Sequence, residues 1–252
     1  PNLPRGIADG PTEIRAMVRE VVRAGADFIK FFNTGFGRDT QNGTTRSYTS
    51  VETRALVNEA HTLGKPVACH AIGGQGLRTA VKAGVDSIEH GCLMGLDPDL
   101  FKMMADNGSY LVPTFTVFTF HAAQGNPHAQ AEANAFQQQH IETVQTALSE
   151  GVRVVAGTDA GGWEHGNNAK ELELLVAAGM SPMQSIVAAT SWAAGCLGFE
   201  KNIGTIEPGK LADVIVVDGN PLTDITILQD KERISIVMKD GQVYRDQLSE
   251  SN

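Results

Sequence analysis

The sequence has few cysteines, no basic run and no long apolar segment. Its three cysteines are odd in number and lack the spacing of a metal site, so we expect no disulfide framework. The net charge is −9, and no basic or aromatic-basic stretch indicates a nucleic-acid surface. No apolar run approaches the length that spans a bilayer. The expected partners therefore exclude nucleic acid and membrane.

The composition is that of an ordinary globular protein with a sizeable core. The 252 residues are 42% hydrophobic and 19% charged, which suits one large domain or two modest ones. Strand patterns alternate with helix patterns five times, without a short-period repeat. The expected strands are 27–32, 66–69, 85–88, 110–118 and 152–159. This alternation predicts an α/β fold, either a parallel sheet or a (β/α) barrel.

The composition changes near residue 200. Residues 203–217 resemble short strands around the turn Glu207-Pro-Gly-Lys, and residues 234–244 resemble a hairpin around Asp240-Gly241. We therefore predict two parts, a partial barrel at 1–200 and a C-terminal β-sandwich portion at 201–252.

Polar side chains close several of the expected strands. His70 and His90 end two consecutive strands, Lys30 lies among apolar neighbours on an earlier strand, and Asp159 ends the last one. The carboxyl ends of barrel strands carry the chemistry of that fold, and imidazole with carboxylate suits a divalent transition metal such as zinc. Burial of Lys30 would favour its neutral amine, which reacts with carbon dioxide to form an anionic carbamate ligand.

Each of these residues also has a structural interpretation. A histidine at a strand end can be a core residue with its hydrogen bonds satisfied. Lys30 can be a buried amine paired with an acid, and Asp159 can be a helix N-cap or a turn residue. Their joint placement favours the metal site.

Several motifs together resemble the amidohydrolase superfamily, and more narrowly its Xaa-Pro dipeptidase-like and imidazolonepropionase-related branch. The match covers nearly the whole chain. The motifs are Gly25-Ala-Asp-Phe-Ile-Lys30, residues 57–61 through His70-Ala, Asp86-Ser-Ile-Glu-His-Gly91, Val112-Pro-Thr114, Ala156-Gly-Thr-Asp-Ala-Gly161 with His165-Gly166, and residues 203–213.

The resemblance implies a (β/α)8 TIM barrel with a small β appendage and a binuclear divalent metal site, with zinc as the expected ion. Lys30 would be a carboxylated bridging ligand, with carbon dioxide as the source of the carbamate. His70 and His90 would hold the second metal. Asp159 would bind the first metal and take the proton from the bridging hydroxide, and His165 would face a small-molecule or dipeptide substrate.

Two departures from the family pattern bear on this expectation. Ile72 stands where the family commonly has a histidine, which affects substrate contacts. The family also has a His-x-His pair on its first barrel strand, and no such pair occurs in these 252 residues. The resemblance thus implies that about strands 4–8 are present. Completion by an N-terminal segment or by homo-oligomerisation is then expected.

Three interpretations follow. The first is a metal-dependent hydrolase of C–N amide or peptide bonds, acting on carboxylate-bearing peptides or N-acyl amino acids. The second is a Schiff-base barrel aldolase that uses Lys30 and leaves the two histidines and Asp159 without a role. The third is a catalytically incomplete chain that needs a companion chain.

Overall fold

The computed structural model describes residues 6–35, 44–123 and 127–248. These form two compact units, residues 6–113 with 127–154, and residues 114–123 with 155–248. The predicted division near residue 200 stays a prediction. Within the described ranges, none of the helices has both the length and the apolar character that a membrane span requires.

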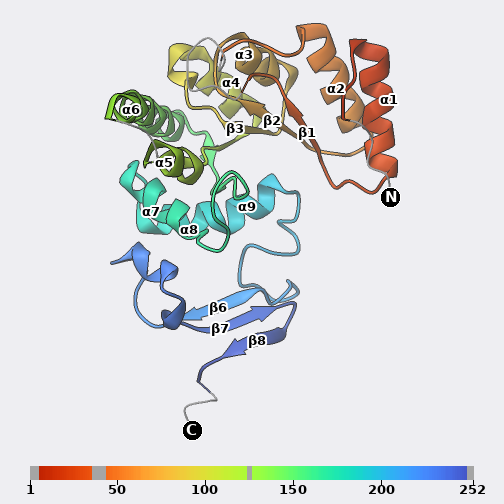
Figure 1. The fold of residues 1–252 in the computed structure, drawn as a ribbon. Helices are drawn as coiled ribbons and strands as arrows, with labels where there is room; N and C mark the ends of the chain where they lie inside the picture. The colour runs from red at the N-terminus through yellow and green to blue at the C-terminus, as the bar shows by residue number, and fades with distance from the viewer. Residues whose placement is uncertain (1–5, 36–43, 124–126, 249–252) are drawn as a thin grey trace. The chain divides into compact units, whose positions relative to one another are not determined.

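The first unit contains a five-stranded parallel sheet with its strands in chain order, which confirms the predicted α/β alternation (Figure 1). The strands are β1 (Ile29–Phe32), β2 (Val67–Ala71), β3 (Ser87–His90), β4 (Tyr110–Val112) and β5 (Arg153–Val154). Its helical segments are α1 (Gly10–Arg23), α2 (Ser50–Thr62), α3 (Gly74–Ala83), η1 (Met94–Leu96), α4 (Asp99–Asn107) and α6 (Pro127–Ser149).

One row of side chains across this sheet lies in the core of the first unit. Neighbouring strands place five apolar residues in register, and all five are buried: Phe31, Cys69, Ile88, Leu111 and Val154. Helices α1 to α4 lie together beside the sheet in Figure 1. Because strand side chains alternate between faces, the residues on either side of this row belong to the opposite face.

Local signals explain where the helices of this unit begin and end. Thr49 and Glu52 form a capping box at the start of α2, in which each side chain bonds the other's backbone N–H. Gly84 ends α3 in the left-handed conformation that glycine adopts without strain. These short-range signals fix the segments that connect the strands.

The structure corrects two expected strands. The strand expected at 152–159 is only Arg153–Val154, and the strand expected at 110–118 ends at Val112. Pro113 follows Val112 and has no N–H for the ladder, so β4 is short and gives β5 only two pairing positions. Residues after Thr114 form helix α5 (Phe115–Ala123) instead of strand.

The second unit combines helices with a three-stranded antiparallel sheet in the order β6-β7-β8. Its elements are α5, α7 (Lys170–Ala177), α8 (Pro182–Ala189), α9 (Ser191–Cys196), β6 (Val214–Val217), η2 (Ile225–Gln229), η3 (Lys231–Arg233), β7 (Ile234–Lys239) and β8 (Gln242–Asp246). The predicted hairpin is confirmed, because Asp240 and Gly241 both have positive φ between β7 and β8.

Candidate metal and catalytic residues

His70 lies on the face of the parallel sheet opposite the row of core residues. It pairs in register with Phe32 on β1 and with Glu89 on β3. The ring of His70 is buried, and its centroid lies 4.8 Å from that of Phe32. Its Nε2 atom lies 3.3 Å from the carbonyl oxygen of Gly35. The carboxyl end of β2 therefore presents an imidazole that neighbouring strands hold in place.

His90 reaches the same place through an unusual backbone conformation. It follows Glu89 on β3, so simple alternation would turn its side chain toward the core row. Instead His90 has a φ of 77°, and its ring centroid lies 4.5 Å from that of His70. Left-handed non-glycine residues cost backbone energy and cluster at functional sites. The predicted convergence of these two histidines is present in the first unit.

The surroundings of His90 favour its neutral form. Burial lowers the pKa of His90 well below its ordinary value, and the nearby His70 and Lys30 lower it further. A third imidazole, His140 of α6, is fully buried, and burial lowers its pKa to about 3 against the opposing effect of main-chain groups of His90 and Pro113. The neutral imidazole is the form that binds metals.

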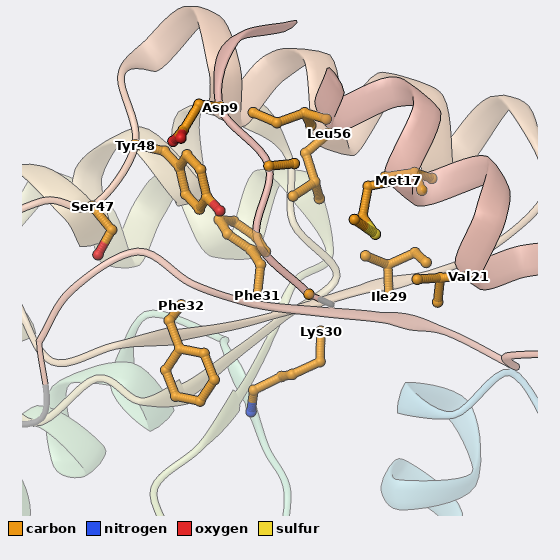
Figure 2. Close-up of a pocket in the computed structure, with 14 residues that line it drawn as sticks. Asp9, Met17, Val21, Ile29, Lys30, Phe31, Phe32, Ser47, Tyr48 and Leu56 are labelled. Carbon is orange, nitrogen blue, oxygen red and sulfur yellow. The ribbon is translucent and has the colours of Figure 1, made fainter. Parts of the chain in front are cut away.

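Lys30 lies on the same face of the sheet as His70, but it is exposed, so the expected burial among apolar neighbours is wrong. Figure 2 shows the reason, since Lys30 and Phe32 extend from one side of β1 while Ile29 and Phe31 extend from the other. The strand β1 is an edge of the sheet in the described residues, and only its other side packs beneath helices. Apolar sequence neighbours therefore did not bury Lys30.

The helix side of β1 borders a cavity of about 450 Å³. Its apolar lining comes mainly from α1, α2 and β1, with Asp9, Lys30, Ser47 and Tyr48 as polar members (Figure 2). Partial burial raises the pKa of Tyr48, with the carboxylates of Asp9 and Glu52 adding to the effect. Neither His70 nor His90 lines this cavity, although Lys30 and Phe32 do, and the Phe32 ring lies beside that of His70.

Hydrogen bonds join the segment after β1 to the segment after β2 and the start of α3. The Asn33 Nδ2 atom donates to the Gly76 carbonyl at 2.8 Å and to Thr79 Oγ1 at 2.9 Å. The Ile72 N–H donates to Thr34 Oγ1 at 3.0 Å. A Cβ atom on Gly76 would lie 2.2 Å from the Asn33 carbonyl oxygen, so only glycine permits this approach. Both strand ends therefore share one network.

Asp159 and His165 belong to the second unit. Asp159 does not close a strand as expected, because β5 ends at Val154, and it is an exposed residue with a φ of 51°. The Gly162 N–H donates to its carbonyl oxygen at 3.1 Å, and Trp163 Nε1 donates to the Thr158 carbonyl at 2.7 Å. These bonds shape a tight loop around Asp159. His165 is exposed further along the same glycine-rich segment.

The described residues contain no cluster of three or more His, Cys, Asp or Glu side chains arranged to hold a metal ion. The predicted ligands within the first unit are His70, His90 and Lys30, of which only the histidines are of those four types. Two imidazoles with adjacent rings fit the nitrogen donors that zinc and related ions accept. The chemistry of the pair is thus compatible with a divalent metal.

Three further buried or hydrogen-bonded polar residues had no role assigned to them from the sequence. Glu89 shares the face of His70 and accepts a hydrogen bond from Ser87 Oγ at 2.6 Å, as strand alternation could have indicated. His140 lies on the apolar stripe of α6, where helical spacing could have marked it. Glu171 is fully buried on α7, and no local pattern distinguishes it from Glu173.

The parallel sheet, its connecting helices and the histidines at its strand ends define a portion of an α/β barrel enzyme fold. The chain belongs to the amidohydrolase family, whose model matches residues 1–244. It is 32% identical over 250 residues to ochratoxinase from Aspergillus niger, and 26% identical over 178 residues to an imidazolonepropionase from Symbiobacterium thermophilum. The predicted family is therefore confirmed.

Solved structures agree with this assignment. A crystal structure of a Xaa-Pro dipeptidase with bound methionine in its active site is 40% identical, with a TM-score of 0.85 over 95% of this chain and 60% of that one. The alignment with ochratoxinase covers 96% of this chain and 51% of that protein, and the one with the imidazolonepropionase covers 68% and 37%. The chain thus spans about half the length of ochratoxinase.

Proposed function

We propose that this protein takes part in the metal-dependent hydrolysis of C–N amide or peptide bonds. The observation that carries the proposal is the meeting of two buried imidazoles, His70 and His90, with ring centroids 4.5 Å apart on adjacent strands of an amidohydrolase-family sheet. Lys30 is exposed on the same face of the sheet, and this position supports it as a third ligand beside the two histidines.

His70 and His90 would hold a divalent metal, with zinc as the preferred ion, and a carbamate formed on Lys30 would add an anionic ligand. The metal would supply Lewis-acid polarisation of the scissile carbonyl and activation of water. The carbamate would form when the neutral amine of Lys30 adds to the carbon of carbon dioxide and releases a proton to solvent water, which reaches this exposed side chain. Asp159 would be a further anionic ligand of the metal site, in addition to the carbamate on Lys30.

Asp159 would also accept the proton of the attacking water and return it to the departing amine. His165, in the same glycine-rich segment, would contact the substrate. Its exposed position leaves its side chain accessible to a small molecule.

The substrates we propose are dipeptides and N-acyl amino acids that carry a free carboxylate. Support comes from relatives, since the Xaa-Pro dipeptidase structure holds methionine and a related prolidase structure holds N-methylphosphonate-L-proline. The Schiff-base alternative is less favoured, because it leaves His70, His90 and Asp159 without a role.

We further propose that turnover requires completion of the sheet, by a longer parent protein, a companion chain or self-association. In the part of the chain that the structure describes, β1 and β5 are the two edges of the parallel sheet. Edge strands present backbone groups that a further strand can pair with. The absence of a His-x-His pair from the 252 residues supports the same proposal.

Metal analysis tests the ligand assignment. The wild-type chain, His70→Ala, His90→Ala and the control His121→Ala are loaded with zinc and measured by elemental analysis and competition titration. We expect His70→Ala and His90→Ala to weaken zinc binding by at least about 100-fold, since groups that only surround a metal already contribute 10- to 100-fold. His121→Ala, an exposed change, should bind as wild type does. Equal affinities in all four proteins would refute the site.

The same preparations test completion. Each size-exclusion peak of the wild-type chain is assayed with Xaa-Pro dipeptides and N-acyl amino acids, with and without a chelator. We expect turnover only in peaks larger than the monomer, or after addition of a companion chain. Robust chelator-sensitive turnover by the monomer would show that completion is not required.

A further inference from the structure

Glu171 is a fully buried carboxylate whose hydrogen-bond partners come from a different helix. Its Oε1 atom accepts from the Phe115 N–H at 2.9 Å, and its Oε2 atom accepts from the Thr116 N–H at 2.8 Å. The Thr116 hydroxyl also donates to Oε2. Both oxygens are therefore occupied by donors of α5, although Glu171 itself is on α7.

These bonds hold the first turn of α5. The first N–H groups of a helix have no partner within the helix, and they carry the positive end of its dipole. A buried carboxyl group here is a strong partner for them, because leaving either side without its hydrogen bonds in the interior is costly. Thr114, just before α5, has a φ of 57°, so the chain enters this helix from a strained residue.

The same first turn of α5 also contacts the loop that carries Asp159. A Cβ atom on Gly162 would lie 3.0 Å from Val117 Cγ2, which shows how closely α5 packs against this glycine. The same hypothetical atom would lie 3.9 Å from Asp159 Oδ2. The Gly162 N–H in turn closes the loop on the Asp159 carbonyl at 3.1 Å. Moving the start of α5 would therefore disturb the backbone of Asp159.

We propose that Glu171 is a positioning residue for Asp159. The carboxylate fixes the start of α5, Val117 then packs against Gly162, and the Gly162 N–H keeps Asp159 in its left-handed conformation. The catalytic half of this inference rests on the proposed function of Asp159, whereas the structural half does not depend on it.

The alternative is that Glu171 only caps α5. A glutamine at position 171 distinguishes the positioning role from the capping role, because its amide nitrogen cannot accept a hydrogen bond. Glu171→Gln loses at least one backbone acceptor, while its shape and burial stay the same. Glu173→Gln is the matched control on the same helix. Glu173 pairs with Lys170 at 2.7 Å and accepts from Gln229 at 2.6 Å, away from α5.

Hydrogen exchange of single amides in the full chain is the first measurement. In Glu171→Gln we expect the exchange of both the Thr116 and the Gly162 amides to accelerate about tenfold, the effect of one unsatisfied buried group. Glu173→Gln should leave both unchanged. If Glu171→Gln accelerates Thr116 but leaves Gly162 as in wild type, Glu171 is a cap and the proposal is wrong.

A second pair of variants tests the proposal in case Glu171→Gln does not fold. Thr116→Val removes the hydroxyl donor and keeps Glu171, and Thr116→Ser retains the donor. Faster exchange at Gly162 in Thr116→Val, with recovery in Thr116→Ser, supports the proposal. Identical Gly162 exchange in both overturns it.

Kinetics on an active assembly test the catalytic half. Glu171→Gln should lower kcat about tenfold with little change in KM, because a misplaced proton acceptor affects the chemical step more than binding. An unchanged kcat beside faster Gly162 exchange would refute the link to catalysis. If no completed assembly that contains the wild-type chain shows turnover, the proposed function fails, and the exchange at Gly162 still decides the structural half.

Discussion

The two sheets of this protein reverse the usual relation between sequence and burial. Strand β6 reads Val-Ile-Val-Val, yet Ile215 is 51% exposed and Val216 is 42% exposed. Strand β3 reads Ser-Ile-Glu-His, yet Ser87, Ile88 and His90 are all buried. The apolar strand is therefore the more exposed of the two, and the polar strand is enclosed.

The difference shows that position in a sheet, more than composition, sets the environment of a side chain. β3 is the middle strand of five, with partners on both sides. β6 is an edge strand of three in the described residues. The polar groups of β3 are tolerated because they find partners, such as the bond from Ser87 to Glu89. A central position is thus what makes a protected imidazole site feasible.

The largest effect that would sharpen this comparison is on the free energy of unfolding. Ile88→Ala removes a fully buried side chain of β3 and should destabilise the protein by about 2–5 kcal/mol. Ile215→Ala, on the exposed strand β6, should change stability by only about 0.5 kcal/mol. Urea denaturation of both variants measures the difference. Equal losses would mean that the two sheets are equally protected.

The second prediction uses the pH dependence of stability. Burial raises the pKa of Glu171 from its ordinary 4.5 to about 7, although the bonds from Thr116 and Phe115 oppose the rise. A folded-state pKa above the unfolded value means that the folded protein holds more protons. The contribution of Glu171 to stability is thus fully present below about pH 4.5 and is lost as the pH rises through about 7.

The size of that loss is on the order of 3 kcal/mol, from the shift of the pKa. Urea denaturation of wild type and Glu171→Gln from pH 4 to pH 8 isolates it, because glutamine does not titrate. The difference between their unfolding free energies should fall across this window. Glu173→Gln serves as the control on α7. A difference that stays constant with pH would place the pKa of Glu171 near its ordinary value.

The third and smallest effect concerns Lys30 on the edge strand. Lys30→Ala should leave stability unchanged, because the side chain is exposed, and should weaken zinc binding by about tenfold. Acetate should partly restore zinc affinity, since solvent reaches this position. Lys82→Ala, an exposed change on α3, is the control. Zinc titration with and without acetate measures this, and full affinity in Lys30→Ala would remove Lys30 from the ligand set.

The sequence was sufficient for the alternation of parallel strands with helices and for the meeting of His70 and His90. Alternating patterns and glycine turns are local signals, and the carboxyl ends of adjacent parallel strands necessarily meet. The exposure of Lys30 was not predictable in this way. It depends on which strands neighbour β1, and the apolar residues around Lys30 in the sequence pack on the opposite side.

Helix α5 shows a second limit of local patterns. Residues 115–118 read Phe-Thr-Val-Phe, a composition that favours strand. They form a helix whose first two N–H groups bond Glu171, 55 and 56 residues away along the chain. Such tertiary contacts override intrinsic propensity, and a glutamate in a helical segment carries no mark of them. The burial of Glu171 and its contacts with α5 could therefore not be predicted from the sequence.

The contact between Gly76 and Asn33 has a consequence for the order in which the protein folds. The start of the loop after β1 is bonded by Ser47 and Tyr48, and also by residues more than 35 positions further along the chain. The more distant of these bonds can form only when the turn that begins α3 lies beside the loop. Local segments form quickly, whereas such distant closures wait for loop entropy to be overcome. The ends of β1 and β2 should accordingly become native in one kinetic step, late relative to the helices that flank them.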